Sequence, residues 1–279
     1  MIRYSFAGLT LEPKRPLAMG VINVTPDSFS DGGEAFRHEA AIARGREMIK
    51  DGASILDIGG ESTRPGAVPV SVEQELDRVI PVIGALAGQG AVISIDTRKA
   101  EVMEAALKAG ADIINDITAL GGDARSLATA AAGNASVILM HMQGEPGHMQ
   151  DDPRYQDAPR EIMEYLAGRI AVCEAAGIKR SRIAVDPGIG FGKTARHNME
   201  ILNRLDEFSR LGCALVLGVS RKRFIAALSR NEPPEARLAG SLAAALAGAE
   251  RGVHILRVHD VAETMQALKV WRAIADGGP

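Results

Sequence analysis

Several classes of protein are excluded by what this 279-residue chain lacks. No run of about 18 apolar residues occurs, so no segment is predicted to span a membrane. Residues 1–16 lack the long apolar stretch of a secretion signal. The formal net charge is only −3, which leaves no overall basic surface for nucleic acid. We therefore expect a soluble cytoplasmic protein whose partners are neither membranes nor nucleic acids.

Cysteine is scarce, because only Cys173 and Cys213 are present. Cys173 falls in a segment with helical spacing, and Cys213 stands just before a strand-like run. This pattern does not indicate a disulfide framework. We expect both residues to be buried free thiols.

Apolar residues are plentiful, at 46% of the chain, which is enough for one large α/β core. Many of them come in short runs of the length typical of strands buried on both faces. Eight such runs occur, at 17–22, 54–58, 91–95, 113–117, 137–142, 183–185, 214–219 and 255–258.

Segments with helical spacing lie between these runs. Apolar residues fall three or four positions apart in 72–86 and again in 261–272. Ser71 and Gln74 have the spacing of a capping box at the start of the first of these helices. Strands that alternate with helices pair in parallel through right-handed crossovers.

Eight such units predict an α/β fold of the (β/α)8 TIM-barrel type, with an open doubly wound sheet as the alternative. We expect a single domain over residues 1–279, in which 17–275 form the barrel. Residues 1–16 are predicted to form an N-terminal hairpin or extension at the bottom of the barrel.

Polar residues stand at the end of every predicted strand, where the active site of a TIM barrel lies. Turn-forming Asp and Asn could account for two or three of these positions. A barrel directs all eight ends towards one mouth, so we predict a polar site there. The residues are Asn23, Asp57, Asp96, Asn115, His141, Asp186, Ser220 with Arg221 and Lys222, and Arg257 with His259.

One group among these residues supplies hydrogen-bond acceptors: Asp57, Asp96, Asn115 and Asp186. A carboxylate accepts two parallel N–H bonds, which suits an amino group beside a ring N–H, as in an aminopyrimidinone. A carboxylate metal cluster is the alternative. We favour recognition of a heterocycle, because the carboxylates come from separate strands without closely spaced His ligands.

A second group is basic and comprises Arg64, Arg221, Lys222, Arg257 and His259. Arg257 and His259 alternate along the last strand, so their side chains emerge on one face. Together these residues predict a pocket for phosphate or diphosphate. A solvated rim is the alternative for each residue singly, and for Arg221 the two interpretations have equal weight.

The segment DPGIGFGKT at 186–194 resembles two nucleotide-binding motifs but matches neither. Pro187 stands where a P-loop needs glycine, and Lys193 replaces the third glycine of GxGxxG. Three glycines at alternate positions instead predict that the backbone passes close to a flat ligand, with Phe191 as a wall. Lys193 is then either a ligand contact or a loop charge.

These motifs together resemble one family, the dihydropteroate synthases of folate biosynthesis. The resemblance runs from about residue 17 to the C-terminus, and its first two segments are long and specific. It rests on GVINVTPDSFSDGG (20–33), LDIGGESTRPGA (56–67), SIDT (94–97), IND (114–116), MHMQG (140–144), DPGIGFGK (186–193), SRK (220–222) and RVHDV (257–261).

The resemblance implies a transferase that joins 6-hydroxymethyl-7,8-dihydropterin diphosphate to 4-aminobenzoate, with Mg²⁺ as cofactor and sulfonamides as inhibitors. Diphosphate departs first, and the neutral arylamine then attacks the cationic methylene without a strong general base. Asp96, Lys222, Arg64 and Asn23 are the implied catalytic residues. A homodimer is also implied, for which the alanine-rich segment 238–249 is a candidate face and core packing an equal alternative.

Three subsites follow from the same resemblance. The implied pterin contacts are Asp96, Asn115, Met140, Asp186, Phe191 and Lys222. The implied diphosphate contacts are Asn23, Thr63, Arg64, Arg257 and His259, with Asn23 also the metal ligand. The implied aminobenzoate contacts are Phe29, Arg64, Pro65, Lys222 and Arg223.

One departure from the family concerns Arg223, which stands where many members carry a hydroxyl residue that helps hold the aminobenzoate carboxylate. Backbone N–H groups at the start of the following helix could bind that carboxylate instead. Residues 24–33 and the loop of Thr63 and Arg64 are implied to be mobile. Residues 24–33 are expected to act as a lid.

Two alternatives from other classes are a methyltetrahydrofolate-binding methyltransferase and an inactive pterin-binding homologue. Neither needs a diphosphate site, whereas STRPGA (62–67) and RVHD (257–260) both supply basic residues for one.

Overall fold

Eight parallel strands close into a barrel in the order β10-β3-β4-β5-β6-β7-β8-β9. The computed structural model describes residues 4–12, 14–25, 34–63 and 68–278. The predicted TIM barrel is confirmed, and every predicted strand lies within two residues of the observed bounds. The strands are β3 (Leu17–Asn23), β4 (Ala53–Gly59), β5 (Val92–Asp96), β6 (Ile113–Asp116), β7 (Ser136–Met140), β8 (Ile183–Asp186), β9 (Ala214–Gly218) and β10 (Ile255–Val258).

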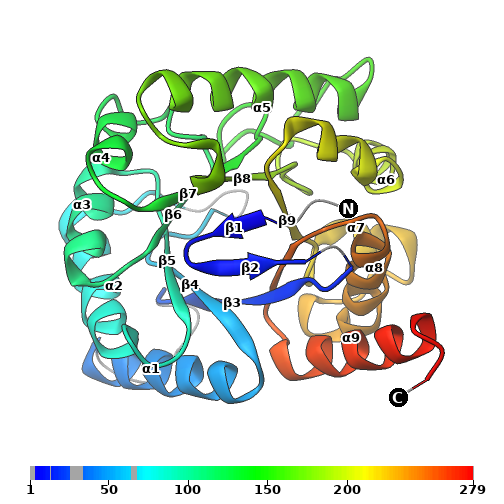
Figure 1. The fold of residues 1–279 in the computed structure, drawn as a ribbon, viewed down its shortest axis with the longest axis horizontal. Coiled ribbons are helices and arrows are strands. Elements are labelled where there is room, and N and C mark those ends of the chain that lie inside the picture. The colour runs from blue at the N-terminus through cyan, green and yellow to red at the C-terminus, as the bar shows by residue number, and fades with distance from the viewer. Residues whose placement is uncertain (1–3, 13, 26–33, 64–67, 279) are drawn as a thin grey trace.

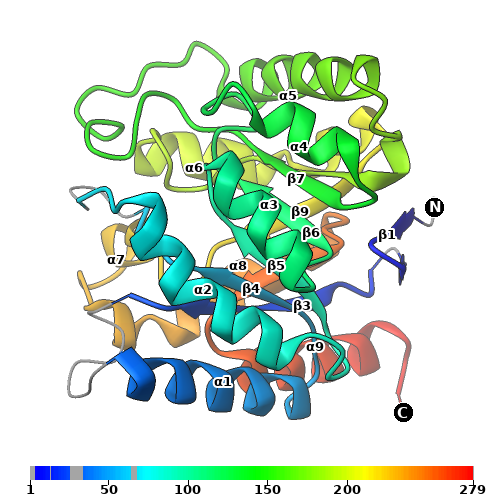
Figure 2. The same cartoon turned by 90° about the vertical axis from the view of Figure 1, so that its left-hand side faces the viewer.

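Helices surround the barrel, as Figure 1 and Figure 2 show. The predicted capping box is present: Gln74 N donates to Ser71 Oγ at 3.2 Å, and Ser71 N donates to Gln74 Oε1 at 3.1 Å. None of the helices in the described part of the chain is long and apolar enough to cross a membrane. The helices are α1 (Glu34–Lys50), α2 (Val72–Leu86), α3 (Ala100–Ala109), α4 (Ser126–Ala132), α5 (Ala158–Ala175), α6 (Ala195–Asn203), α7 (Arg223–Leu228), α8 (Leu238–Glu250) and α9 (Val261–Ala275), with short 3₁₀ turns η2 (Arg180–Arg182), η3 (Leu205–Leu211) and η4 (Pro234–Ala236).

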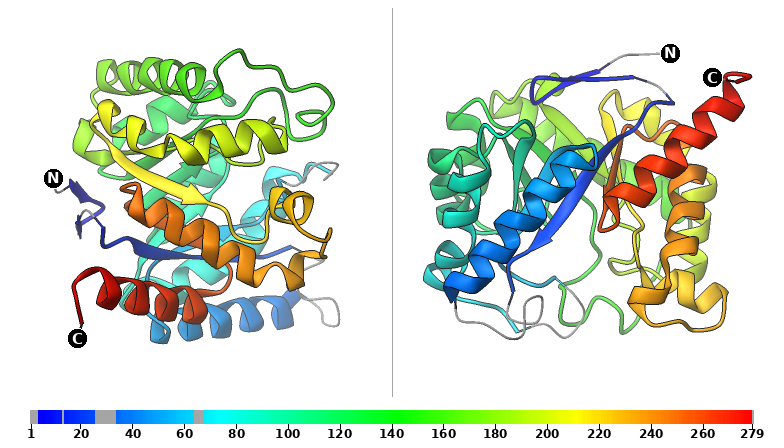
Figure 3. Two further views of the ribbon diagram at one scale, coloured as in Figure 1. Left: turned by 90° about the vertical axis from the view of Figure 1, so that its right-hand side faces the viewer. Right: turned by 90° about the horizontal axis from the view of Figure 1, so that it is seen from below.

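The predicted N-terminal hairpin covers one end of the barrel, as the right-hand view of Figure 3 shows. Strands β1 (Tyr4–Phe6) and β2 (Leu9–Leu11) pair antiparallel. Ala7 and Gly8 between them have φ angles of 48° and 77°, as a tight hairpin turn requires. Phe6 and Leu11 are buried in one cluster with the barrel's interior residues. The hairpin therefore closes the N-terminal end of the strands.

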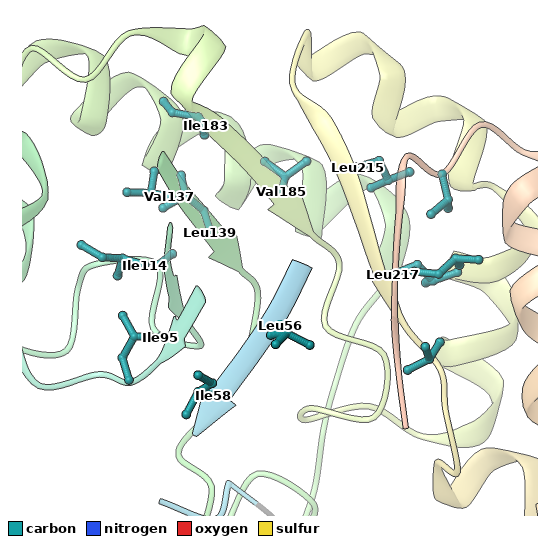
Figure 4. Close-up of a cluster of buried hydrophobic side chains, with 14 of the residues drawn as sticks. Leu56, Ile58, Ile95, Ile114, Val137, Leu139, Ile183, Val185, Leu215 and Leu217 are labelled. Atoms are coloured by element: carbon teal, nitrogen blue, oxygen red, sulfur yellow. The ribbon is translucent and has the colours of Figure 1, made fainter. Parts of the chain in front are cut away.

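Strand alternation divides the barrel side chains into two sets. Outward residues such as Leu56, Ile114 and Leu139 form the large cluster of Figure 4, which also contains residues of the surrounding helices. Inward residues form an apolar layer nearest the hairpin: Met19, Ile55, Ile113, Ile138, Ala184, Val216 and Ile255.

Two residues further along the strands, the inward positions change in character. They are now occupied by Val21, Asp57, Asn115, Met140, Asp186, Gly218 and Arg257. Ser94 and Asp96 take the corresponding places on β5, where Ser94 pairs with Asp57 and Asp96 with Asn115. A layer rich in polar residues therefore rests directly on the apolar layer at the C-terminal mouth.

Both cysteines are buried and free, as predicted. Cys173 lies in α5 and Cys213 just before β9. Both belong to the cluster between the barrel and its helices. Cys173 and Cys213 therefore contribute to the hydrophobic core and not to the mouth of the barrel.

Candidate active site

A connected set of charged side chains occupies the mouth. Arg257 Nε donates to Asp57 Oδ2 at 2.6 Å, and Arg257 Nη2 donates to Asp96 Oδ2 at 2.7 Å. Asn115 Nδ2 donates to the same Asp57 oxygen at 3.1 Å. Side chains from β4, β5, β6 and β10 thus meet at one place, as their positions at strand ends predicted.

The electrostatics of this set are dominated by burial. Burial raises the pKa of Asp96 to about 7, with Asp57, Glu75 and Asp116 reinforcing the shift and Arg257 opposing it. Burial by itself lowers the pKa of Arg257, but its two carboxylate partners outweigh burial and raise that pKa overall. One guanidinium is therefore shared between two buried carboxylates, so the cluster keeps an excess of negative charge.

Asp186 and Lys222 are a further carboxylate and ammonium of the mouth, each of which influences the pKa of the other. Asp186 Oδ1 accepts from Gly188 N at 2.7 Å. The Lys222 ammonium donates to the carbonyl of Ile189 and stands 4.5 Å from the centre of the Phe191 ring. Burial raises the pKa of Asp186, and burial lowers the pKa of Lys222 to about 8, while each charge opposes the shift of the other.

Met140 and His141 point in opposite directions from the end of β7. Met140 belongs to the inward layer, and a Cβ at Gly188 would lie 3.3 Å from Met140 Cγ. His141 Nδ1 instead lies 3.0 Å from Lys193 Nζ, and its ring packs edge-on against Tyr165. The prediction that every strand-end polar residue faces the mouth is wrong for His141. Successive side chains of a strand point to opposite faces, so His141 points away from the side to which Met140 points.

Two of the three glycines of 186–193 pack against the chain that follows β7. Gly188 and Gly192 have φ angles of 68° and 60°. A Cβ at Gly188 would lie 2.0 Å from the carbonyl oxygen of His141, and one at Gly192 would lie 2.3 Å from that of Gln143. Close approach to the chain that follows β7 therefore requires these two glycines, and the approach of a flat ligand stays a prediction.

Asn23 and His259 border a cavity of about 870 Å³ beside α1, which Arg44 and Arg221 also line. His259 Nδ1 is 2.9 Å from Ser220 Oγ. Arg221 Nε donates to an oxygen of Asp260 at 3.0 Å, so this guanidinium is held at the rim by a carboxylate. Of the predicted basic group, Arg221 and His259 line this cavity, and α1 adds Arg44, Arg46 and Lys50 beside the acidic Glu47.

Arg257 does not stand apart from the acceptors with the other basic residues. The acceptor group and the basic group are thus joined at Arg257. Barrel closure is the physical reason: Arg257 pairs in register with Met19 of β3 and Gly218 of β9, and the inward side chain reaches across to Asp57 and Asp96.

Several predicted residues lie at the edge of the described structure or beyond it. Thr63 precedes the undescribed positions 64–67, to which Arg64 and Pro65 belong, and Phe29 lies within 26–33. The predicted lid at 24–33 is thus almost wholly outside the described residues. Arg223 is exposed in the first turn of α7, and Lys222 immediately precedes that helix.

Ion pairs that sequence reasoning missed hold the start of the segment leading to Thr63. Arg98 Nη2 donates to Glu61 Oε1 at 2.8 Å, and Lys99 pairs with both Glu61 and the buried Glu75. These pairs join the loops after β4 and β5 to α2. No local motif signals them, since the partners are 24 to 38 residues apart.

A resident metal centre is not evident in the described part of the chain, where no three His, Cys, Asp or Glu side chains gather to hold an ion. Mg²⁺ commonly takes only one or two protein oxygens and completes its shell with water and substrate phosphate. The carboxamide oxygen of Asn23, at the end of β3 beside the basic cavity, suits that arrangement. The residues present therefore fit a Mg²⁺ that arrives with a diphosphate.

Comparisons with known proteins agree along nearly the whole chain. The family described as pterin binding enzyme matches residues 19–259. A dihydropteroate synthase of Escherichia coli (strain K12) is 49% identical over 267 residues, which are 95% of this chain and 94% of that protein. One from Neisseria meningitidis serogroup C is 48% identical over 263 residues, 93% of each chain.

Solved structures show the same likeness. The Xanthomonas albilineans dihydropteroate synthase with 4-aminobenzoic acid has a TM-score of 0.90 and 49% identity, and the match covers 98% of each chain. The same enzyme in complex with 7,8-dihydropteroate has a TM-score of 0.85 and 43% identity, with 98% of each chain covered. The Yersinia pestis enzyme in a sulfonamide drug complex has a TM-score of 0.91 and 44% identity, with 99% of this chain and 100% of that chain covered.

Proposed function

The chain belongs to the dihydropteroate synthases of the pterin-binding enzyme family, and on this premise we propose how its residues share that reaction. The reaction is the transfer that joins 6-hydroxymethyl-7,8-dihydropterin diphosphate to 4-aminobenzoate, giving 7,8-dihydropteroate and diphosphate in folate biosynthesis. The observation that carries our assignment of roles is the inward polar layer resting on the apolar layer of the barrel.

The pterin subsite is formed by the acceptors of that layer. Asp96, Asn115 and Asp186 accept or exchange hydrogen bonds with the amino group and ring N–H groups of the pterin. Lys222 donates to its opposite edge, and the ring lies between Met140 and Phe191. What supports this assignment is that the inward side chains at the C-terminal ends of β5, β6, β7 and β8 are neighbours in register: Asp96 pairs with Asn115, and Met140 pairs with Asp186.

The diphosphate subsite lies on the side of Asn23 and His259, where the basic cavity opens. Thr63 and Arg64 belong to this subsite by their motif, although Arg64 is outside the described residues, and Arg257 contributes from its place beside Asp57 and Asp96. Asn23 would hold Mg²⁺, and the ion would supply positive charge to offset that of the departing diphosphate. The arginines hold the same leaving group by charge-assisted hydrogen bonds.

Electrostatic stabilisation is the main chemical contribution of the protein. The buried carboxylate of Asp96 places negative charge beside the pterin, where positive charge develops as the diphosphate bond breaks. The arylamine needs no strong base, since it is neutral at pH 7. The remaining tasks are placement of the amine and exclusion of water.

The aminobenzoate subsite involves Lys222 and the first turn of α7. Phe29, Arg64 and Pro65 complete it from the two loops outside the described residues. Lys222 immediately precedes α7, so an anion held by its ammonium also meets backbone N–H groups that lack helical partners. Arg223 is exposed on that turn and adds attraction for a carboxylate without enclosing it.

A direct assay tests the function. The protein with Mg²⁺, the pterin diphosphate and 4-aminobenzoate should release diphosphate and form dihydropteroate, and sulfonamides should compete with 4-aminobenzoate. Pterin binding without turnover would favour an inactive homologue. Methyl transfer from methyltetrahydrofolate to a corrinoid would favour the methyltransferase alternative.

A homodimer and a cytoplasmic location stay predictions from the family. The outer face of α8 supports the first, because Ala239, Ala243 and Ala247 are exposed at a spacing of four residues. Light scattering in solution would decide the oligomeric state.

A further inference from the structure

We propose that Lys193 is a positioning residue for the pterin subsite: it ties the carbonyl of Phe191 to the residue after Met140 and so fixes the spacing between the side chains of Met140 and Phe191. The proposal rests on the proposed function, because it concerns how that subsite is built. Lys193 acts through the backbone and does not touch the pterin.

The side chain of Lys193 is enclosed, with only 3% of the residue exposed. Its Nζ donates to the carbonyl of Phe191 at 2.8 Å and to the carbonyl of His141 at 3.2 Å. The third neighbour is Nδ1 of His141, at 3.0 Å. A buried amine whose three polar contacts all lie on these two residues links the chain after β8 to the chain after β7.

The contacts are satisfied whichever way the proton is placed. An ammonium donates to both carbonyls and to the ring nitrogen of neutral His141. A neutral amine donates to the carbonyls and accepts from that ring nitrogen when it carries the proton. Burial lowers the pKa of His141 to about 3 and lowers the pKa of Lys193 well below its ordinary value, so the link does not depend on one charge state.

Three other carbonyls of the segment are also held by side chains, while those of Asp186 and Gly188 accept from the backbone N–H groups of His141 and Phe191. Lys222 donates to the carbonyl of Ile189, Gln150 Nε2 donates to that of Gly190 at 2.6 Å, and the Tyr155 hydroxyl donates to that of Gly192 at 3.0 Å. Among the donors to these carbonyls, Lys193 is the one that also bonds His141, the residue next to Met140. It is therefore placed to set the distance between Met140 and Phe191, whereas Met140 and Asp186 are already paired between β7 and β8.

The experiment compares Lys193→Met with the wild-type protein. Loss of bonds from a buried amine should raise the KM for the pterin diphosphate, and the calorimetric Kd for plain pterin, by about tenfold or more. The KM for 4-aminobenzoate should change less than about twofold. Lys193→Gln, which can still bond one carbonyl, should give an intermediate rise and serves as the test should Lys193→Met not fold.

Arg182→Met is the matched control, because Arg182 Nε donates to the carbonyl of Ala135 at 2.9 Å and Nη2 to that of Ala130 at 3.2 Å. It immediately precedes β8 at the end far from Asp186. This variant should lower Tm and leave pterin binding unchanged. An unchanged pterin Kd in both Lys193 variants, or an equal rise in Arg182→Met, would overturn the proposal. Failure of wild-type turnover with intact pterin binding would instead count against the proposed function, while the Kd comparison still decides the role of Lys193.

Discussion

Arg257 is the residue on which both halves of the site depend. Its guanidinium is shared between two carboxylates, the buried Asp57 and the largely buried Asp96. Removing one partner of a buried ion pair is costly because the other charge remains without compensation. A residue assigned to the diphosphate by its motif therefore also organises the pterin acceptors.

Replacing Arg257 should thus damage more than diphosphate binding. We expect Arg257→Ala to lower the free energy of unfolding by about 3 kcal/mol and to raise the calorimetric Kd for plain pterin at least about tenfold. Arg257→Ala combined with Asp57→Asn should regain part of the stability, since one uncompensated carboxylate is gone. Arg221→Ala is the control, because its ion pair with Asp260 lies at the rim. Plain pterin binding that survives Arg257→Ala would restore the simpler division into separate subsites.

The charge states of Asp96 and Lys222 predict the pH dependence of the reaction. Asp96 acts as a carboxylate and has a pKa raised to about 7, so activity should fall as the pH drops below that value. Lys222 acts as an ammonium and has a pKa lowered to about 8, so activity should fall again as the pH rises above that value. We expect a narrow, bell-shaped dependence of kcat/KM on pH. Its two apparent pKa values belong to the coupled cluster of charged groups.

Two measurements check the origin of the acidic limb. Asp96→Asn should lower the maximum of kcat/KM and abolish the fall in kcat/KM on the acidic side of pH 7. Calorimetry with plain pterin should show the same limb in the wild-type protein, which separates it from titration of the substrate's own phosphates. A flat pterin Kd from pH 6 to pH 8 would contradict the assignment.

At the scale of elements, the segment 186–193 and the chain after β7 behave as one unit. Gly188 and Gly192 allow the two backbones to touch, and side-chain donors hold the carbonyls between them. The apparent nucleotide-binding pattern in the sequence is therefore a consequence of backbone packing. Phosphate recognition does not explain it.

Substitution of Gly192 tests this explanation against a matched control. Gly192→Ala should destabilise the protein by about 3 kcal/mol, since a Cβ would lie 2.3 Å from the carbonyl oxygen of Gln143 in addition to the strain of a positive φ. Gly177 also has a positive φ, but a Cβ there would have no neighbour within 4 Å. Gly177→Ala should therefore lower the free energy of unfolding by only about 1 kcal/mol. Chemical denaturation measures both. Equal costs would show that conformation alone requires glycine at 192.

At the scale of the whole molecule, stability and chemistry are placed at opposite ends of the barrel. The hairpin of β1 and β2 buries Phe6 and Leu11 against the inward apolar layer. The polar mouth begins two residues further along the strands. The apolar layer supports the charged one without contributing to its chemistry.

Phe6→Ala should therefore cost stability and spare function. We expect a loss of about 3 kcal/mol in the free energy of unfolding, from the apolar area and cavity terms of a buried aromatic. The KM values for both substrates should stay within about twofold. Thr10→Ala, at an exposed position of the same hairpin, is the control and should change neither quantity. A raised pterin KM in Phe6→Ala would show that the hairpin and the mouth are mechanically coupled.

Much of this protein is determined by local sequence. Apolar runs of strand length alternating with helical segments predict a parallel barrel, because each buried strand needs helices to cover it. The direction of a side chain follows from its position in the strand, so Asp57, Asn115 and Asp186 are inward once the layer beneath them is identified. The same rule, applied residue by residue, would have assigned Met140 to the mouth and His141 to the outside.

Tertiary structure alone decided which polar groups became partners. Arg257 lies 200 residues from Asp57, and Lys193 lies 52 from His141, so neither pairing leaves a local signal. Closure of the barrel sets the register that brings β10 beside β3, and burial then makes any unpaired charge costly. Periodicity along the chain determines which residues face inward, whereas the choice of partner depends on distances that exist only after the first and last strands have met.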